Sequence, residues 1–284
     1  MRHVNRILIP TIAAVIVFGC YDEFDPKSYQ PVFTISGYSA TDEIEPTSLS
    51  AYWSFDEGLT ETVSGTEATN HEVTQVNGFK GQGVSFNANS PSWLLSETPP
   101  NIAALGSFTI SFWVNPTFVD SDGNGSIDGI IGLVGISNPT RFWGNLEWFI
   151  ENNSNPDAAI VKVILTHDNA TETDIVVNNY KGLFDNWTNH ALTYDAETST
   201  LSYYINGSRL ATKAAPWTGP IIFSGSGPMV FGTAQFQTSP SLTNHGPESW
   251  ASHLTGSIDE VRVYNKALSA TDINALVVLQ GKGK

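Results

Sequence analysis

Oxygen-bearing side chains recur at every second position of one short loop, VDSDGNGSIDG, which runs from Val119 to Gly129. They are Asp120, Asp122, Asn124, Ser126 and Asp128. This spacing, with glycine at the sixth position, matches the first nine residues of an EF-hand calcium loop. The bidentate glutamate expected at the twelfth position is absent, because Ile131 stands there. Two interpretations follow: a truncated calcium loop, or a long polar hairpin turn that needs no ion.

Aromatic residues supply a second candidate chemistry, because sugars bind by stacking on exposed rings while polar groups hold their hydroxyls. The segment 141–151 alternates like a strand with two faces. The face expected to be buried carries Phe142, Leu146, Trp148 and Ile150. The face expected on the outer surface carries Trp143, Asn145, Glu147 and Glu151. We expect Trp143 to be the stacking platform, with Asn145 and Glu147 as its hydrogen-bonding groups.

Three further tryptophans, Trp93, Trp217 and Trp250, lie in segments rich in proline, serine and glycine. We expect them to contact the same ligand from the rim of the domain. Each of them could instead plug one end of the core, since a chain with eight tryptophans must bury most of them.

The elements that must position these residues are mostly strands. From Ser50 onward, alternation of apolar and polar residues predicts an antiparallel all-β protein. The clearest expected strands span residues 108–115, 201–205 and 258–264. Asn206-Gly207 after the second strand is a strong hairpin signal, because both turn positions need positive φ. One short helix is expected through about Leu279, because Ser269 and Asp272 form a capping-box-like start.

The N-terminus has the layout of a secretory signal, with Arg2 and Arg6 before a short apolar run. That run ends in Gly19-Cys20, which resembles the lipobox of bacterial lipoproteins, and Cys20 is the only cysteine in the chain. A plain signal peptide with an incidental cysteine is the alternative. The expected division is a signal peptide, an acylated tether and a folded domain, over residues 1–19, 20–48 and 49–284. The acidic stretch Tyr21-Asp22-Glu23 resembles the tag of surface-exposed lipoproteins, which implies an outer-membrane, cell-surface location.

The charge balance excludes some partners. The chain has 28 acidic and 13 basic residues, a formal net charge of −15. Such a surface repels phosphate backbones, so we expect no nucleic-acid partner. It also leaves membrane attachment to the expected lipid anchor rather than to a basic patch. A single cysteine forms no internal disulfide, so stability must come from the core or from bound ions.

Six segments in order resemble a LamG-type, concanavalin A-like jelly roll, the laminin-G and pentraxin type of lectin fold. They are residues 51–58, 78–86, 107–116, 186–194, 201–207 and 256–268. The resemblance covers about residues 50 to 278 and implies two facing antiparallel sheets. It also implies carbohydrate or protein bound on the concave face or at the loop rim. The relatives it suggests are lipoproteins found with outer-membrane glycan-uptake systems.

The same resemblance implies a structural calcium ion between the first and last strands. In the family it is held by an early acidic residue, a carbonyl in a glycine turn and a late aspartate. Asp56, the turn at Gly81 and Gly83, and Asp259 match those places. The alternative is that Asp56 and Asp259 only hydrogen-bond the turns at strand ends.

Catalysis is disfavoured by one substitution. Laminarinase-type glycoside hydrolases use the same jelly roll, with a Glu-x-Asp-x-Glu strand that supplies nucleophile and acid. Glu147 and Glu151 stand at the outer positions here, but Phe149 replaces the aspartate. We expect no hydrolase activity.

The sequence therefore predicts a non-catalytic, lipid-anchored polysaccharide-binding protein that serves glycan uptake and contains structural Ca²⁺. The alternative is a protein-binding, adhesion or structural LamG module. The two differ in their exposed apolar residues. A sugar site needs one or two rings over a polar groove, whereas a protein site needs a broad apolar patch.

Overall fold

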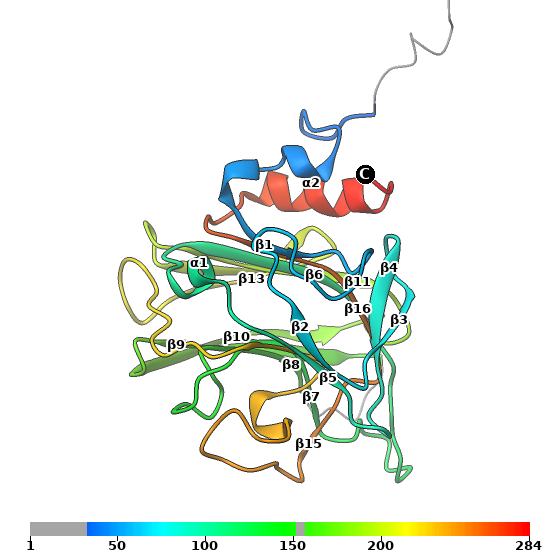
Figure 1. Cartoon of the computed structure of the whole chain (residues 1–284). Helices are drawn as coiled ribbons and strands as arrows, with labels where there is room; N and C mark the ends of the chain where they lie inside the picture. Colours follow the sequence, from blue (N-terminus) through cyan, green and yellow to red (C-terminus); the bar gives the residue numbers. More distant parts are fainter. Residues whose placement is uncertain (1–32, 152–156) are drawn as a thin grey trace, which may run out of the picture. The chain divides into compact units, whose positions relative to one another are not determined.

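Alternating apolar positions on many strands meet in one core between two layered sheets (Figure 1). The computed structural model describes residues 33–151 and 157–284, and residues Thr34–Lys284 form one compact unit. Cys20, the expected signal peptide and residues 20–32 of the expected tether lie outside the described residues. In the described part, no helix is both long enough and apolar enough to cross a membrane.

The first sheet, which we call the helix-side sheet, has eight strands in the order β13-β12-β11-β6-β16-β4-β3, with β1 also paired to β16. Their bounds are β1 Leu49–Trp53, β3 Thr74–Asn77, β4 Gln82–Phe86, β6 Phe108–Pro116, β11 Thr188–Asp195, β12 Thr200–Ile205, β13 Ser208–Ala214 and β16 Gly256–Tyr264. The strands expected over 108–115, 201–205 and 258–264 are confirmed as β6, β12 and β16. The expected hairpin at Asn206-Gly207 is also confirmed, and both residues have positive φ.

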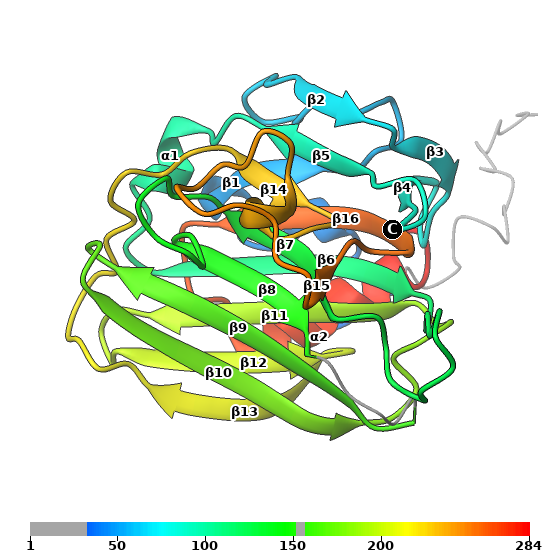
Figure 2. The ribbon, with the colours of Figure 1, turned by 90° about the horizontal axis from the view of Figure 1, so that it is seen from below.

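The second sheet, which we call the loop-side sheet, also has eight strands, in the order β10-β9-β8-β7-β14-β5-β2 (Figure 2). The eighth strand, β15, pairs in parallel with β7, whereas the other pairings are antiparallel. Their bounds are β2 Ala68–His71, β5 Trp93–Ser96, β7 Ile130–Ile136, β8 Leu146–Ile150, β9 Ala159–His167, β10 Thr171–Tyr180, β14 Met229–Phe231 and β15 Ala251–Ser252. The predicted two-sheet antiparallel sandwich is thus confirmed.

The core between the sheets is aromatic and closely packed. Trp148 on β8 is fully buried, and its indole N–H donates to the Tyr203 hydroxyl of the opposite sheet at 2.8 Å. Phe112 on β6 packs edge-on against the same indole, with a centroid separation of 4.8 Å. Burial of rings this large is the main stabilising term available to a chain without disulfides.

Helix α2, Ala270–Gln280, covers the outer face of the helix-side sheet (Figure 1). Its expected start is confirmed, because Ser269 caps the helix and forms the capping box with Asp272. The short helix α1 (Pro100–Ala103) and three 3-10 turns, η2 (Thr41–Glu43), η3 (Pro46–Ser48) and η4 (Gln235–Gln237), complete the fold.

The segment before β1 belongs to the folded unit. Ile44 is 1% exposed and is buried in the same cluster as Leu276 and Leu279 of α2. The folded unit therefore begins before residue 49, where the sequence analysis placed its start. The single apolar residue Ile44, within a polar and Pro-rich stretch, gave too weak a signal to show this.

Candidate functional site

The acidic loop between β6 and β7 is held in a tight conformation by hydrogen bonds from its backbone to its own side chains. Asp120 accepts hydrogen bonds from the backbone N–H groups of Asn124 (3.0 Å) and Gly125 (2.8 Å). Asp122 accepts from the Asn124 N–H at 3.1 Å, and the Asn124 side-chain oxygen accepts from the Ser126 N–H at 2.7 Å. These bonds are those of Asx turns, which such residues form without an ion as well.

Three carboxylates converge in this loop. Asp120, Asp122 and Asp128 each offer one oxygen, and these oxygens all lie within 4.8 Å of one another. Like charges this close repel, and a divalent cation bound by oxygen ligands would remove the repulsion. The three aspartates are therefore the candidate calcium ligands, as the sequence predicted. Asn124 and Ser126, predicted with them, line a hollow beside the loop. The Asn124 side-chain oxygen, however, is bonded to the Ser126 N–H group within the loop.

The twelfth position of the loop pattern, where an EF-hand has its glutamate, falls on a buried strand residue. Ile131 lies in β7, is 3% exposed and contributes to the core. Ser252 on β15 is its partner in the parallel ladder, and Ser249 lies just before that strand. Both serines line the hollow beside the loop.

We call this space the loop hollow. It has a volume of about 500 Å³ and places Trp250 beside the acidic loop. Its lining consists of Asp122, Asn124, Ser126, Ile127, Asp128, Gly129, Ser249, Trp250, Ala251 and Ser252. The contact is tight, because the Ile130 N–H donates to the Trp250 carbonyl at 3.1 Å. A Cβ atom at residue 129 would lie 2.6 Å from that carbonyl oxygen, so only glycine fits there.

Trp250 is the exposed tryptophan of the described chain, with 43% of its surface accessible. Its ring rests against Phe236 at 5.4 Å and Phe142 at 5.9 Å, and Trp143 lies 6.0 Å away. Neighbouring rings on one side hold the indole in place while the rest of its surface meets solvent. This arrangement suits a stacking platform, as expected for a rim contact.

The exposure expected for Asn145 and Glu147 is wrong. Alternation correctly sends Leu146, Trp148 and Ile150 into the core, but Asn145 is 0% and Glu147 is 1% exposed. Figure 1 shows the reason: the segment 232–254, with η4 and β15, lies over the outer face of the loop-side sheet. Strand alternation predicts the side of a sheet and not what covers it.

Trp143 and Phe142 also differ from expectation. Trp143 is half-buried and stacks on Phe149 at 5.1 Å, within a cluster that includes Phe236. Phe142, expected in the core, belongs to that outer cluster because β8 begins only at Leu146. The alternation therefore does not extend back to residue 142.

Trp93 and Trp217 are buried rather than exposed at the rim. Each is 8% exposed. Trp93 lies on β5 and stacks on His71 at 4.6 Å, and Trp217 stacks on His167 at 4.9 Å. Their neighbourhood of Pro, Ser and Gly residues indicated a loop, but a loop segment that closes the sandwich buries its large rings.

The buried Glu147 carboxyl has an altered acidity. Burial raises the pKa of Glu147 well above its usual range, although a backbone hydrogen bond from Gln235 opposes the rise. Its Oε1 atom has no hydrogen-bond partner among the described residues. Glu151 on the same strand side forms an ion pair with Lys162 instead. The two glutamates therefore have unrelated environments.

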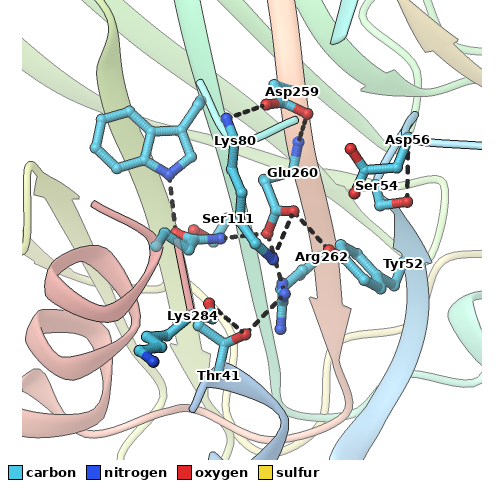
Figure 3. Close-up of polar contacts among 12 residues, drawn as sticks. Thr41, Tyr52, Ser54, Asp56, Lys80, Ser111, Asp259, Glu260, Arg262 and Lys284 are labelled. Atoms are coloured by element: carbon cyan, nitrogen blue, oxygen red, sulfur yellow. Dashed lines mark hydrogen bonds and ion pairs between the residues drawn. The ribbon is translucent and has the colours of Figure 1, made fainter. Parts of the chain in front are cut away.

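The second predicted calcium site is assembled in part (Figure 3). Asp56 accepts from the Gln82 N–H at 2.8 Å, and Asp259 accepts from the Lys80 N–H at 2.9 Å, so both carboxylates hold the turn before β4. Burial raises the pKa of Asp259 to about 7, and the charges of Glu260 and Asp56 add to the rise. Asp56 and Asp259 thus bond to the same turn, and whether they hold calcium stays a prediction. Their bonds to the turn are also those of the alternative without an ion.

Sequence reasoning missed a buried ionic network beside this turn. A bulge in β16 between Asp259 and Arg262 gives Glu260 a positive φ of 52°. The fully buried Glu260 carboxylate accepts from the Tyr52 hydroxyl (2.6 Å), the Gln280 amide (2.8 Å) and the Arg262 guanidinium (3.0 Å) (Figure 3). Burial would raise the pKa of Glu260, but Arg262, Tyr52 and Lys80 lower it below its usual value. The network joins β1, β16 and α2, which identifies it as structural.

Residues 88–274 match Laminin_G_3, described as the concanavalin A-like lectin/glucanases superfamily. Since the match spans more than half of the chain, the protein belongs to this family, and the predicted jelly-roll class is confirmed. No curated protein matches the sequence.

Similar solved structures are binding domains of toxins. The binding domain of Paraclostridial Mosquitocidal Protein 1 matches with a TM-score of 0.59 and 17% identity, over 81% of this chain and 52% of that chain. The binding domain of Botulinum neurotoxin DC matches in a complex with rat synaptotagmin II (0.59, 15%, 84% and 52%) and in one with SialylT (0.59, 17%, 82% and 52%). At these identities the similarity shows the fold, and the chain spans about half the length of these structures.

Proposed function

We propose that the protein binds polysaccharide without catalysis, at the loop hollow. The observation that carries the proposal is the joint placement of the exposed Trp250 and of Asp122 and Asp128, two of the three convergent carboxylates, on one hollow of about 500 Å³. A ring for stacking beside oxygen-rich groups is the combination that sugar recognition needs.

The two parts have complementary roles. Asp120, Asp122 and Asp128 would hold Ca²⁺. This ion takes six to eight oxygen ligands, which is more than three carboxylates provide. Ser249 and Ser252, which carry hydroxyl groups, also line the hollow. Sugar hydroxyls can bind to such groups while the apolar face of the same sugar stacks on Trp250.

The absence of catalysis is part of the proposal and rests on the glutamate pair. A retaining glycosidase needs two carboxyl groups about 5 Å apart across an accessible bond. Glu147 is covered by the segment 232–254, and Glu151 is held by Lys162. With Phe149 between them, neither group is placed to serve a substrate.

Carbohydrate binding is tested with immobilised polysaccharides, with and without chelator. We expect Trp250→Ala to weaken binding by about 1–3 kcal/mol, as for other aromatic platforms. The double variant Asp120→Ala/Asp122→Ala should lose the calcium-dependent part. Glu97→Ala, an exposed carboxylate outside the hollow, is the matched control. If no polysaccharide binds and a protein ligand is captured through Trp250, the protein-binding alternative is correct.

We further propose that the protein is an acylated outer-membrane lipoprotein that presents its domain at the cell surface to a glycan-uptake system. The support is the apolar run that ends in Gly19-Cys20, with no other cysteine in the chain. Cys20→Ala should release the protein from the membrane fraction. A variant that stays membrane-bound contradicts the anchor.

A further inference from the structure

A second hollow, the polar groove, lies on the helix-side sheet and has a volume of about 620 Å³. Its lining consists of Ser85, Phe86, Asn87, Asn89, Asn115, Thr117, Asp185, Thr255, Gly256 and Ser257. It shares no lining residue with the loop hollow. Its volume is within the usual range of small-molecule sites.

Strand register arranges the floor of this groove. Ser257 on β16 pairs with Ser85 on β4 at one side and with Asn115 on β6 at the other. Their neighbours Val84, Ile258 and Val114 point into the core. Alternation therefore sends the three polar side chains to the outer face, as a row across three adjacent strands.

These side chains have unused hydrogen-bonding capacity. Among the described residues, no partner bonds to the side chains of Ser85, Asn115, Ser257 or Asp185. Further along the same face, the Asn189 amide N–H group has a partner, because it donates to the Ser111 hydroxyl at 3.1 Å. A ligand rich in hydroxyl groups can therefore bond to this row in place of solvent.

The wall of the groove is fixed in place. Thr255 accepts from the Ala88 N–H at 3.0 Å, and the Asn87 side chain accepts from the Asn89 N–H at 2.9 Å. These bonds hold the segment after β4 against the start of β16. A wall that is ordered before binding reduces the entropy that a ligand must overcome.

An aromatic ring borders the row. Trp187 directly precedes β11, whose Thr188 pairs with Val114, so Trp187 lies beside Asn115. Its half-buried ring contacts Phe79 at 6.3 Å, and Phe79 stacks on Trp113 at 3.4 Å. Trp113 lies on the outer face, since its indole donates to Gln280 of α2. The aromatic group thus lies on the same face as the polar row.

We infer that the polar groove is a second glycan site, which binds a neutral stretch of polysaccharide by hydrogen bonds and without calcium. The lining holds amides and hydroxyls, one carboxylate (Asp185) and no basic residue, so it disfavours phosphate, sulfate and uronic-acid ligands. The inference rests on the proposed function in that the ligand is a glycan. Two sites on one domain would raise the avidity for a polymer.

The test uses neutral hexasaccharides in chelator: cellohexaose, laminarihexaose, maltohexaose, xylohexaose and mannohexaose. The protein is the Asp120→Ala/Asp122→Ala variant, which removes the loop site. We expect one of these probes to bind by calorimetry. Ser257→Leu, which adds apolar bulk to the floor, and Ser85→Ala/Asn115→Ala should each weaken that binding by about tenfold or more. Thr212→Ala on the exposed edge strand β13 is the control.

The outcomes separate the two sites. If no hexasaccharide binds in chelator, or if binding is unchanged in Ser257→Leu, the groove is not a glycan site, whatever the loop does. If hexasaccharide binding persists in chelator and is lost in Ser257→Leu, the groove stands even when the calcium-dependent site fails. Melting of the groove variants near that of their Asp120→Ala/Asp122→Ala parent excludes unfolding as the cause, because the side chains of Ser85, Asn115 and Ser257 have no hydrogen bond to lose among the described residues.

Discussion

The outer faces of the two sheets carry side chains in the same alternating way, yet a row on β8 is covered while a row across β4, β16 and β6 is open. On the loop-side sheet, Glu147 and Phe149 are covered by the segment 232–254 and are nearly inaccessible. On the helix-side sheet, α2 leaves Ser85, Asn115 and Ser257 half-exposed beside a hollow. The difference shows that a strand pattern fixes the face of a residue, while long-range chain placement fixes its exposure.

The largest effect on stability is expected when a tryptophan of the core is compared with a tryptophan of the outer cluster. Trp148→Ala should lower the free energy of unfolding by about 3–5 kcal/mol, because it removes a fully buried indole and its bond to Tyr203. Trp143→Ala should cost less, about 1–3 kcal/mol, since its ring is half-buried in the outer cluster. Urea denaturation of both variants measures the difference. Equal losses of unfolding free energy would mean that the outer cluster packs as tightly as the core.

A smaller effect is expected where the acidic loop is compared with the Asp56–Asp259 turn. An ion bound only by the folded state adds about 2.7 kcal/mol at a hundredfold excess over its dissociation constant. Melting should therefore fall in chelator, and Asp120→Ala should remove most of that difference. Asp259→Ala tests the turn in the same way, and Glu97→Ala is the control for charge. A melting curve that chelator leaves unchanged would make VDSDGNGSIDG a polar turn.

Local sequence predicted the parts of the molecule that depend on local physics. The strands β6, β12 and β16, the hairpin at Asn206-Gly207 and the cap at Ser269 all follow from alternation, turn preference and capping. The loop spacing likewise brought Asp120, Asp122 and Asp128 together. Each of these signals is contained within about a dozen residues.

The rest depends on pairings between distant segments. Trp250 meets the acidic loop only because β15 adds to β7 in parallel, a two-residue pairing that no local pattern announces. The polar groove needs three strands whose polar positions coincide in register, from residues 85, 115 and 257. Contacts of this kind follow from topology rather than from spacing.

The smallest expected effect is a pH dependence of stability, which tests how well the segment 232–254 excludes water from Glu147. Because burial raises the pKa of this carboxyl, the folded state keeps its proton where the unfolded state has lost it. Stability should therefore fall as the pH rises from about 4.5, the ordinary pKa of the group, toward its raised value in the fold. One such group changes the free energy of unfolding by at most about 1.4 kcal/mol per pH unit. Glu147→Gln keeps the shape of the side chain but removes the titrating group. It should therefore reduce the fall of stability with pH, measured from melting curves between acidic and neutral pH in chelator. Asp259 titrates in the same direction, so part of the slope should remain. An unchanged slope in Glu147→Gln would mean that water reaches the carboxyl and that the cover opens in solution.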